Sequence, residues 1–443
     1  MELEYKLSFI DTLSMAAGFA VGSGIITLTG IGIGMTGRSV FLAFPVCSVL
    51  FLVSFRPLFI MSGVHPSMSA AYEYSKTLLG VRMGGFYSYI YLLGRLTIAI
   101  FGVSFAQYAA ALFPVFDAPG AQRLLASLML TFFYVVNLLG IKTASRLQTL
   151  CSVLLLLGLG SFVFFGLGKV RADFFTTNFF TGGIGGFYSA VSLLFFAVSG
   201  AYIITDFAPR IRNPAGTMLK VIHLVTAAVT VLYMLIGVVA AGCGSVDTVA
   251  GKPLSVTAQI IYPNRILFGA FVIIGVMGAL VTTLNSSFLW YASSLEKPCL
   301  DGWLPSSWIK RNRFGVPYRL MTVFYLFGLI PTVLGMDLAI LSKVAVGLTI
   351  LSAMLPMAGV IRLPSVYPEE WKNSRFAKKY SERRLSCICA LSILIMSTQV
   401  IALFAGNPPA ANTILVALIV ISALYANYRA KNIGKTTGNK NVK

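Results

Sequence analysis

Long apolar segments follow one another along the chain and are separated by shorter polar stretches. Twelve of them reach the length of about 20 residues that a helix needs to cross the ~30 Å hydrocarbon core of a bilayer. None alternates between apolar and polar positions over about ten residues, as the strands of a membrane barrel do. Because backbone groups inside lipid must find partners within their own segment, the pattern predicts helices. The predicted spans are residues 9–34, 39–62, 84–114, 122–140, 148–168, 186–207, 217–242, 266–294, 318–336, 338–361, 385–405 and 409–428.

Composition supports an integral membrane protein. Of the 443 residues, 57% are hydrophobic and only 11% are charged, whereas an ordinary soluble domain has about 25% charged residues. So few charges cannot cover the surface of a soluble chain of this length. This argues against soluble enzymes, nucleic-acid-binding modules, disordered proteins and disulfide-stabilised domains. The lipid bilayer is the expected environment, and no nucleic acid partner is expected.

The net charge of +20 is interpreted by position, because basic residues collect on the cytoplasmic side of membranes. An even number of spans puts both ends of the chain on one side. With the N-terminus inside, the inner segments hold about 26 Lys and Arg residues and the outer loops hold about six. This asymmetry predicts a multi-pass protein of the cell membrane with cytoplasmic N- and C-termini.

Two spans contain glycine and serine near the middle of the membrane, at residues 22–25 in the first span and 196–200 in the sixth. Glycine weakens a helix interior, and paired interruptions are typical of transporters built from inverted repeats. Free amides at 23–25 would bind a carboxylate, and carbonyls near 196–199 would bind an ammonium group. Together they predict a site for an α-amino acid backbone. Close packing of small residues between helices is the alternative explanation.

Five motifs follow one another along the chain. They are Gly22-Ser23-Gly24-Ile25; Pro66-Ser67, Ser69-Ala70-Ala71-Tyr72, Tyr74 and Gly80; Asn137, Gly140-Ile141-Lys142 and Gln148; Phe195-Phe196-Ala197, Gly200 and Asn213-Pro214; and Asn285-Ser286-Ser287, Asp301-Gly302, Leu304-Pro305, Gly315 and Pro317. In order and register they resemble the motifs of the amino acid–polyamine–organocation superfamily of permeases. The resemblance covers about residues 10–360, with a looser fit in the last two spans.

This resemblance implies an all-α membrane fold of twelve helices, the LeuT-like fold, with spans 1–5 and 6–10 as inverted repeats and helices 1 and 6 discontinuous. It implies a transport core at residues 1–380, two further spans at 381–430 and a cytoplasmic tail at 431–443. It also implies secondary transport of amino acids or related amines. The residues expected to bind the substrate are Gly22, Ser23, Gly24, Ile25, Arg95, Phe196, Ala197, Ser199, Gly200, Tyr202 and Ser287.

Departures from the family pattern bear on ion coupling. Tyr202 stands where many members carry glutamate, and Leu155 stands where some proton-linked members carry a lysine in place of a sodium ion. Sodium coupling and uncoupled exchange therefore stay open, and apart from Na⁺ or H⁺ no cofactor is expected. By register, the candidate sodium ligands are the hydroxyls of Thr282 and Thr283, followed by those of residues 286–287. Hydroxyls in such a helix also commonly bond to their own backbone.

The aromatic side chain of Phe196 has two possible roles. Phe196 stands where many members of the superfamily place an aromatic side chain over the bound substrate. The alternative is an aromatic side chain of the protein core.

Arg95 lies about eleven residues into the third span, roughly 16 Å deep at 1.5 Å per residue. An arginine at that depth costs at least ~2.5–3.5 kcal/mol unless it faces protein or water. No acidic residue is predicted at a similar depth. We hypothesise that Arg95 recognises a polar or acidic side chain of the substrate. The alternative is a structural arginine that binds helix-end carbonyls or reaches Asp11 or Asp206.

The sequence favours a secondary active transporter, a permease or exchanger, that moves amino acids by alternating access as a monomer or homodimer. An antiporter of polyamines or amine products on the same fold is the first alternative, and a channel or sensor is the next. An enzyme is not expected, because no nucleophile–base pair stands out. No metal site is expected either, because His65 and His223 are isolated and lack ligand spacing.

Overall fold

Helices make up most of the chain in the computed structural model, which describes residues 6–139 and 144–438. Within these ranges the β pairing is limited to one bridge between Leu7 and Ile211, so the predicted all-α class is confirmed. The α-helices are α1 Phe9–Ala20, α2 Ser23–Thr36, α3 Val40–Ser54, α4 Arg56–Val64, α5 Ala70–Leu79, α6 Val81–Leu93, α7 Thr97–Leu112, α8 Pro119–Leu138, α9 Ala144–Leu167, α10 Gly183–Val198, α11 Pro214–Gly242, α12 Val246–Val249, α13 Leu254–Ile261, α14 Arg265–Ala270, α15 Gly278–Leu300, α16 Tyr318–Val333, α17 Leu338–Met357, α18 Leu363–Val366, α19 Pro368–Asn373, α20 Glu382–Ala405 and α21 Pro409–Gly438. The 3₁₀ segments are η1 Gly37–Ser39, η2 Gly94–Leu96, η3 Pro114–Phe116, η4 Ser199–Arg210, η6 Ser306–Ile309 and η7 Ala358–Arg362, and η5 Phe271–Met277 is a π-helical stretch.

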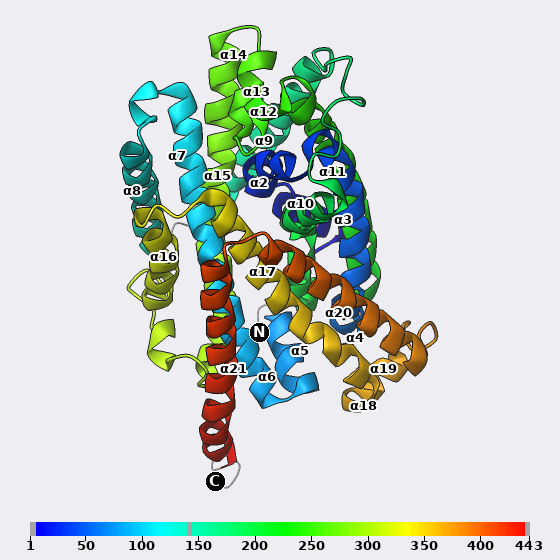
Figure 1. Cartoon of the computed structure of the whole chain (residues 1–443). Helices are drawn as coiled ribbons and strands as arrows, with labels where there is room; N and C mark the ends of the chain where they lie inside the picture. Colours follow the sequence, from blue (N-terminus) through cyan, green and yellow to red (C-terminus); the bar gives the residue numbers. More distant parts are fainter. Residues whose placement is uncertain (1–5, 140–143, 439–443) are drawn as a thin grey trace.

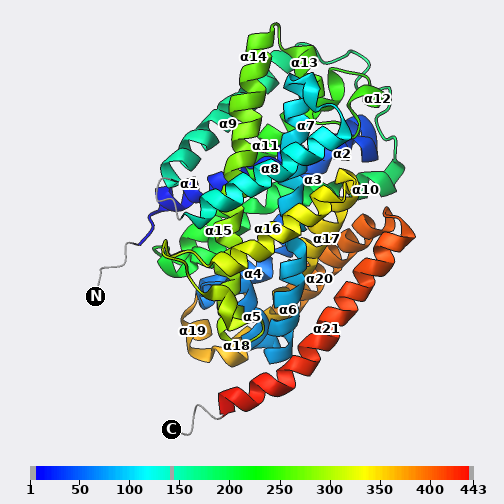
Figure 2. The same ribbon diagram turned by 90° about the vertical axis from the view of Figure 1, so that its left-hand side faces the viewer.

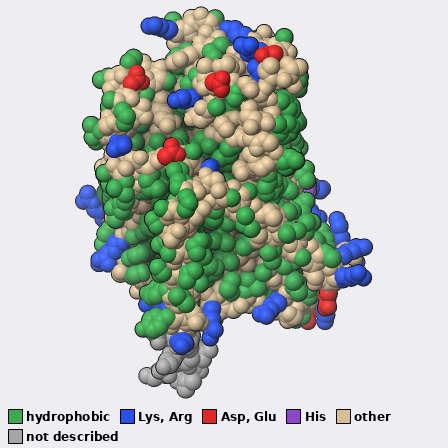
Figure 3. Space-filling view, in the orientation of Figure 1, with side chains coloured by type: hydrophobic (Ala, Val, Ile, Leu, Met, Phe, Trp, Pro, Cys, Tyr) green, Lys and Arg blue, Asp and Glu red, His purple; other side chains and the backbone are tan. Residues whose placement is uncertain are grey.

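Nine helical runs in the described part of the chain are long and apolar enough to cross a membrane. The first, Phe9–Ser54, covers two of the predicted spans. Two shorter apolar helices, Val153–Leu167 and Tyr318–Val333, fall on two further predicted spans. On the face seen in Figure 3, hydrophobic side chains cover most of the middle, and most charged side chains lie toward the upper and lower parts. These features confirm a multi-pass membrane protein, while the number twelve stays a prediction.

Several of the predicted spans are interrupted, among them the first, the third and the sixth. The first is divided into α1 and α2, with Val21 and Gly22 between them in extended conformation. The sixth changes from α10 to the 3₁₀ segment η4 at Ser199. The third, which the sequence did not predict to be interrupted, contains the short 3₁₀ segment η2 between α6 and α7.

The interrupted helices lie in the interior of the bundle. Helix α10 packs against α2 and α3, and α11 packs against α1, α3 and α9. On another side, α7, α8 and α16 pack together (Figure 1). Helix α21 packs chiefly on α6 and runs along the outside of the molecule (Figure 2). The short helices α12–α14 lie at one end of the bundle, and α18, α19 and the end of α21 lie at the other.

Candidate functional site

The break in the first span exposes the N-terminus of α2. The first amides of a helix have no acceptor within it, and Gly22 offers no side-chain cap to those of α2. The hydroxyl of Ser23 is buried and makes no hydrogen bond to the described residues. A helix N-terminus also carries a partial positive charge. The site therefore has donors suited to a carboxylate, and one of them is a side chain without a protein partner.

The break in the sixth span is a change of helix type. The change from α to 3₁₀ geometry at Ser199 moves hydrogen bonds from four to three residues apart. A change from four-residue to three-residue spacing leaves one carbonyl at the junction without a helical amide partner. The Ser199 hydroxyl reaches the carbonyl of Phe196 only at 3.5 Å. This junction offers acceptors suited to an ammonium group.

The two breaks pack directly against each other. A Cβ added to Gly24 would lie 2.8 Å from the Cα of Ala197. A Cβ added to Gly200 would lie 2.2 Å from the carbonyl oxygen of Phe19. Contacts this short are possible only for glycine. The start of α2 thus meets the end of α10, and the start of η4 meets the end of α1, so the two broken helices cross in opposite directions.

Two buried tyrosines from neighbouring helices bind backbone groups beside the first break. The hydroxyl of Tyr233 on α11 donates to the carbonyl of Ala20, at the end of α1, over 3.0 Å. The hydroxyl of Tyr108 on α7 donates to the carbonyl of Ile26 in α2 over 2.9 Å and accepts from the Leu254 amide of α13 over 3.0 Å. Each half of the broken helix therefore has its own side-chain anchor.

A cavity of about 110 Å³ lies where the two breaks meet. The predicted substrate residues that line it are Gly22, Ser23, Gly24, Arg95, Phe196, Ala197, Ser199, Gly200, Tyr202 and Ser287. Ile25 does not line it, because its side chain is completely buried among other helices. The candidate sodium ligand Thr283 also lines it, and the side chain of Thr282 lies outside the described residues.

Several residues that line the cavity are not among those predicted from the sequence. They include Phe101 on α7, Trp290 and Tyr291 on α15, and Thr349 on α17. On α15 a signal was present, because positions 283, 287, 290 and 291 repeat at helical spacing and share one face. The extension of this face beyond the predicted hydroxyls shows that α15 forms a whole wall of the cavity.

Arg95 is held in the cavity wall by aromatic rings. Its side chain is buried, and its Nε donates to the carbonyl of Tyr91 over 3.0 Å. The guanidinium carbon lies 3.9 Å from the ring centre of Tyr91 and 4.2 Å from that of Tyr291. The Tyr291 hydroxyl is bonded in turn to Thr97. Neither Asp11 nor Asp206 forms an ion pair with Arg95, so that part of the structural alternative is not supported.

Thr283 lies close to the first break. A Cβ at Gly22 would be 3.7 Å from the Thr283 hydroxyl oxygen. This places a hydroxyl of α15, one of the candidate sodium ligands, beside the break between α1 and α2. Leu155, at the position of the family lysine, is buried in the apolar core.

At one end of the bundle, α5 is tied to the end of α15. Lys76 forms a 2.7 Å ion pair with Asp301, and Tyr72 donates to the same carboxylate. Burial, reinforced by this hydrogen bond, raises the pKa of Tyr72, so its hydroxyl stays protonated and donates. Glu73 pairs with Lys297 at 2.6 Å. These contacts fix the segment that follows α4.

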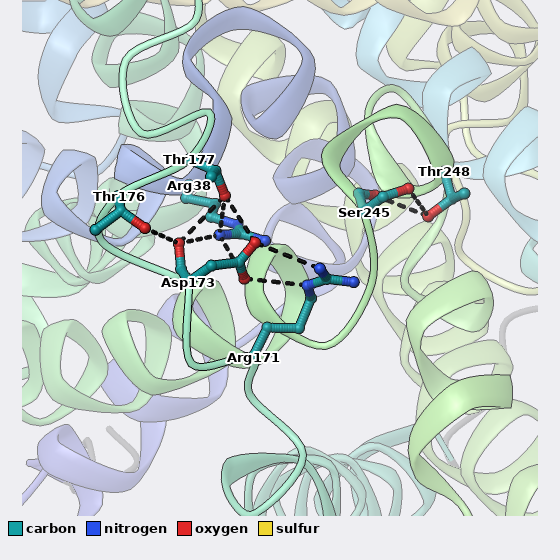
Figure 4. A network of polar contacts seen from close by, with 7 residues as sticks. All are labelled: Arg38, Arg171, Asp173, Thr176, Thr177, Ser245 and Thr248. Atoms are coloured by element: carbon teal, nitrogen blue, oxygen red, sulfur yellow. Dashed lines mark hydrogen bonds and ion pairs between the residues drawn. The ribbon is translucent and has the colours of Figure 1, made fainter.

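At the other end, a polar network joins the loop before α10 to the turn after α2 (Figure 4). The guanidinium of Arg38 is buried, bonds to the carbonyl and carboxylate of Asp173, and donates to Thr177 over 2.7 Å. Arg171 also pairs with Asp173, at 3.1 Å. The hydrogen bond from Arg171, with further bonds from Thr177 and Arg38, holds the pKa of Asp173 well below its usual value. The network stays charged at neutral pH.

Across residues 6–139 and 144–438, no group of three or more His, Cys, Asp or Glu side chains could hold a metal ion. The cavity itself is lined by hydroxyls, aromatic rings, backbone groups and one arginine. Its chemistry is that of non-covalent binding of a small polar solute.

Comparisons with known proteins agree with this chemistry. A family model described as amino acid permease matches residues 7–424. The vacuolar cationic amino acid transporter 4 of Arabidopsis thaliana is 24% identical over 328 residues, which cover 69% of this chain and 54% of the plant protein. An uncharacterised protein of Methanocaldococcus jannaschii is 24% identical over 332 residues, 69% of this chain and 71% of the archaeal one. The chain thus spans about half the length of the plant transporter. It belongs to the amino acid permease family, as its five sequence motifs indicated.

Proposed function

We propose that this protein is a secondary active transporter that moves amino acids across the cell membrane by alternating access. The observation that carries the proposal is the meeting of two helix breaks at one cavity, with amides on one side and carbonyls on the other. Amides of α2 and the hydroxyl of Ser23 bind the α-carboxylate. Carbonyls at the α10–η4 junction bind the ammonium group, and the ring of Phe196 covers the substrate.

In this proposal the chain crosses the membrane twelve times, and spans 1–5 and 6–10 are inverted repeats. The opposite crossing directions of the two broken helices support such a relation, because equivalent helices of inverted repeats run in opposite senses. The excess of basic residues in the predicted inner segments supports cytoplasmic termini. The region up to residue 380 is then the transport core, and α20 and α21 lie outside it.

Sodium is the first coupling ion to test, with uncoupled exchange as the alternative. Sodium binds oxygen ligands, and the hydroxyl of Thr283 lies beside Gly22 at the first break. Leu155 offers no proton-accepting group at the position of the family lysine. A sodium ion at the break would connect α1 and α2 to α15 and so link ion binding to movement of the broken helix.

A second candidate is transport of cationic amino acids, which the name of the plant relative suggests. Transport of polyamines or amine products is a further alternative, but a substrate without a carboxylate would leave the Ser23 hydroxyl and the α2 amides unused. Competition separates these classes, because the proposal requires both an α-carboxylate and an α-amine on the competitor.

The test is uptake of a labelled amino acid panel into proteoliposomes, with sodium, proton and internal-substrate gradients imposed one at a time. We expect saturable uptake of at least one amino acid, stimulated by one of these gradients and inhibited by amino acids more than by the matching amines. Flux that rises linearly with concentration would indicate a channel. Absence of uptake of every amino acid by a monodisperse protein would contradict the proposal.

A further inference from the structure

The charge of the cavity points to the class of amino acid that it binds. Arg95 is 2% exposed and lies in the 3₁₀ segment η2, between α6 and α7. Its Nε donor is used by the carbonyl of Tyr91. The rings of Tyr91 and Tyr291 lie at 3.9 and 4.2 Å from the guanidinium carbon. The orientation of the guanidinium is therefore fixed before a substrate arrives.

The positive charge of Arg95 has no anionic partner among the residues that the structure describes. The basic groups that form ion pairs there are Arg38, His65, Lys76, Arg171, Lys297 and Arg311. The two Nη groups of Arg95 donate to none of the described residues, so four of its five N–H donors remain for a ligand. The faces of two tyrosine rings stabilise a cation but do not neutralise its charge. Buried charges are as a rule paired with an opposite charge.

Arg95 is also the source of the cavity's charge. The other side chains that line the cavity are aromatic, aliphatic or hydroxyl-bearing and carry no formal charge. A cationic side chain of a substrate would thus be buried beside a fixed positive charge with no carboxylate to offset it. A carboxylate would instead complete the donors that the protein leaves open, because guanidinium binds carboxylate through two parallel hydrogen bonds.

We propose that the preferred substrates are amino acids with an acidic side chain, and that Arg95 binds the side-chain carboxylate. This inference rests on the proposed amino acid transport and adds the substrate class. The α-carboxylate lies at the start of α2, the ammonium group at the α10–η4 junction, and the second carboxylate against Arg95. These acidic amino acids carry the opposite side-chain charge to the cationic amino acids in the name of the plant relative.

The experiment compares acids with their uncharged isosteres. In proteoliposomes, uptake efficiencies are measured for glutamate against glutamine and aspartate against asparagine, with lysine as the cation. A charge-assisted bidentate contact is worth roughly 1.5–3 kcal/mol, so we expect the wild-type protein to prefer at least one acid over its amide by about 10- to 150-fold. Lysine is expected to be the poorest substrate.

Variants assign this preference to one side chain. Arg95→Gln is expected to bring the acid-to-amide ratio close to one while uptake of the amide is retained. Arg95→Lys keeps the charge without the planar fork and should retain part of the ratio. Lys343→Gln is the matched control, because Lys343 is another cation within a span, bonds to the carbonyl of Gly406 and does not line the cavity. It should leave the ratio unchanged.

Three results would overturn the inference. The first is a wild-type protein that takes up glutamine or lysine as well as it takes up glutamate, which would leave amino acid transport intact and remove only the substrate class. The second is a loss of all substrates by the same factor in Arg95→Gln protein that is monodisperse and melts like wild type, which would assign Arg95 to the α-carboxylate or to structure. The third is an Arg95→Gln protein that keeps the wild-type ratio. If neither Arg95 variant folds, a wild-type ratio of one is still sufficient to reject the inference.

Discussion

Two glycines determine how closely the broken helices approach each other. Gly24 faces Ala197, and Gly200 faces the backbone of Phe19, at separations that leave no room for a methyl group. The obstacle at Gly200 is a backbone carbonyl, which cannot rotate away as a flexible side chain can. The geometry of the cavity therefore depends on these two positions.

We predict that Gly200→Ala abolishes uptake or reduces it to less than about a tenth. The added methyl group would lie 2.2 Å from the Phe19 carbonyl oxygen, so α1 and η4 must separate. Overpacking of this kind costs about 1–3 kcal/mol, which should also lower Tm. Gly185→Ala on α10 is the control, because a Cβ there meets nothing within 4 Å. Normal uptake by Gly200→Ala protein would refute the close crossing of the two breaks.

We predict that Ser23→Ala weakens substrate binding and leaves stability nearly unchanged. Its hydroxyl is buried, lines the cavity and has no partner in the described chain, so its removal breaks no protein hydrogen bond. Loss of one hydrogen bond to a charged group corresponds to a rise in KM of roughly 10-fold or more. Thr29→Val in the same helix is the control, because the Thr29 hydroxyl bonds to the carbonyl of Ile25. Equal KM values for wild type and Ser23→Ala would contradict a carboxylate site at α2.

The residues at the breaks could be predicted from sequence because glycine, serine and arginine are unusual inside an apolar span. Trp290, Tyr291 and Thr349 could not be predicted in the same way. The sequence pattern of an apolar helix does not distinguish an aromatic or threonine side chain that faces lipid from one that faces another helix or a cavity. Which face of α15 or α17 meets the cavity depends on how the surrounding helices pack, and that information is non-local.

Among the elements, α5 is the connector whose contacts the sequence did not reveal. This segment lies between the second and third predicted spans, and the structure shows there a helix held to the end of α15 through Asp301 and Lys297. In addition, Asp206 at the end of the sixth span accepts from the Ala70 amide over 2.9 Å. Helix α5 thus touches both a broken helix and the wall formed by α15.

We predict that Asp301→Asn lowers Tm by a few degrees. The substitution removes the charge that pairs with Lys76 at 2.7 Å and weakens the acceptor of Tyr72. The pair is about a quarter exposed, so a loss of roughly 1 kcal/mol is expected rather than the value for a fully buried pair. The comparison is Glu296→Gln, because Glu296 pairs with the more exposed Arg311 of the following loop. An equal or larger effect of Glu296→Gln would contradict a specific role for α5.

The network around Asp173 predicts a pH dependence of stability. Because its folded-state pKa is lowered, the stabilisation is complete above the unfolded value near 3.8 and is lost as the pH falls through the folded value. We expect Tm of the wild-type protein to fall below about pH 4, and Asp173→Asn to remove part of this fall. Asp117→Asn is the control, because the Asp117 carboxylate has no basic partner in the described ranges. Parallel Tm curves for wild type and Asp173→Asn would refute the assignment.

At the scale of the whole molecule, the sequence predicts the fold class more reliably than the number of membrane spans. Hydrophobicity and the basic asymmetry predict a multi-pass helical protein, and the all-helical structure agrees. The number of spans is harder, because α1 to α3 form one continuous apolar run and α9 and α16 are short or partly outside the described residues. An inverted repeat is harder still to predict from sequence, since it would relate helices that share no obvious sequence and are recognised only by how they cross.

The central claim is that one amino acid binds where the two helix breaks meet. The most direct test is an experimental structure of the purified protein at saturating glutamate. We expect one molecule in the cavity, with its α-carboxylate at the amides of residues 23–25, its ammonium group at the carbonyls near residues 196–199, and its side-chain carboxylate against Arg95. Glutamate bound elsewhere, or an empty cavity in a protein that transports glutamate, would contradict it.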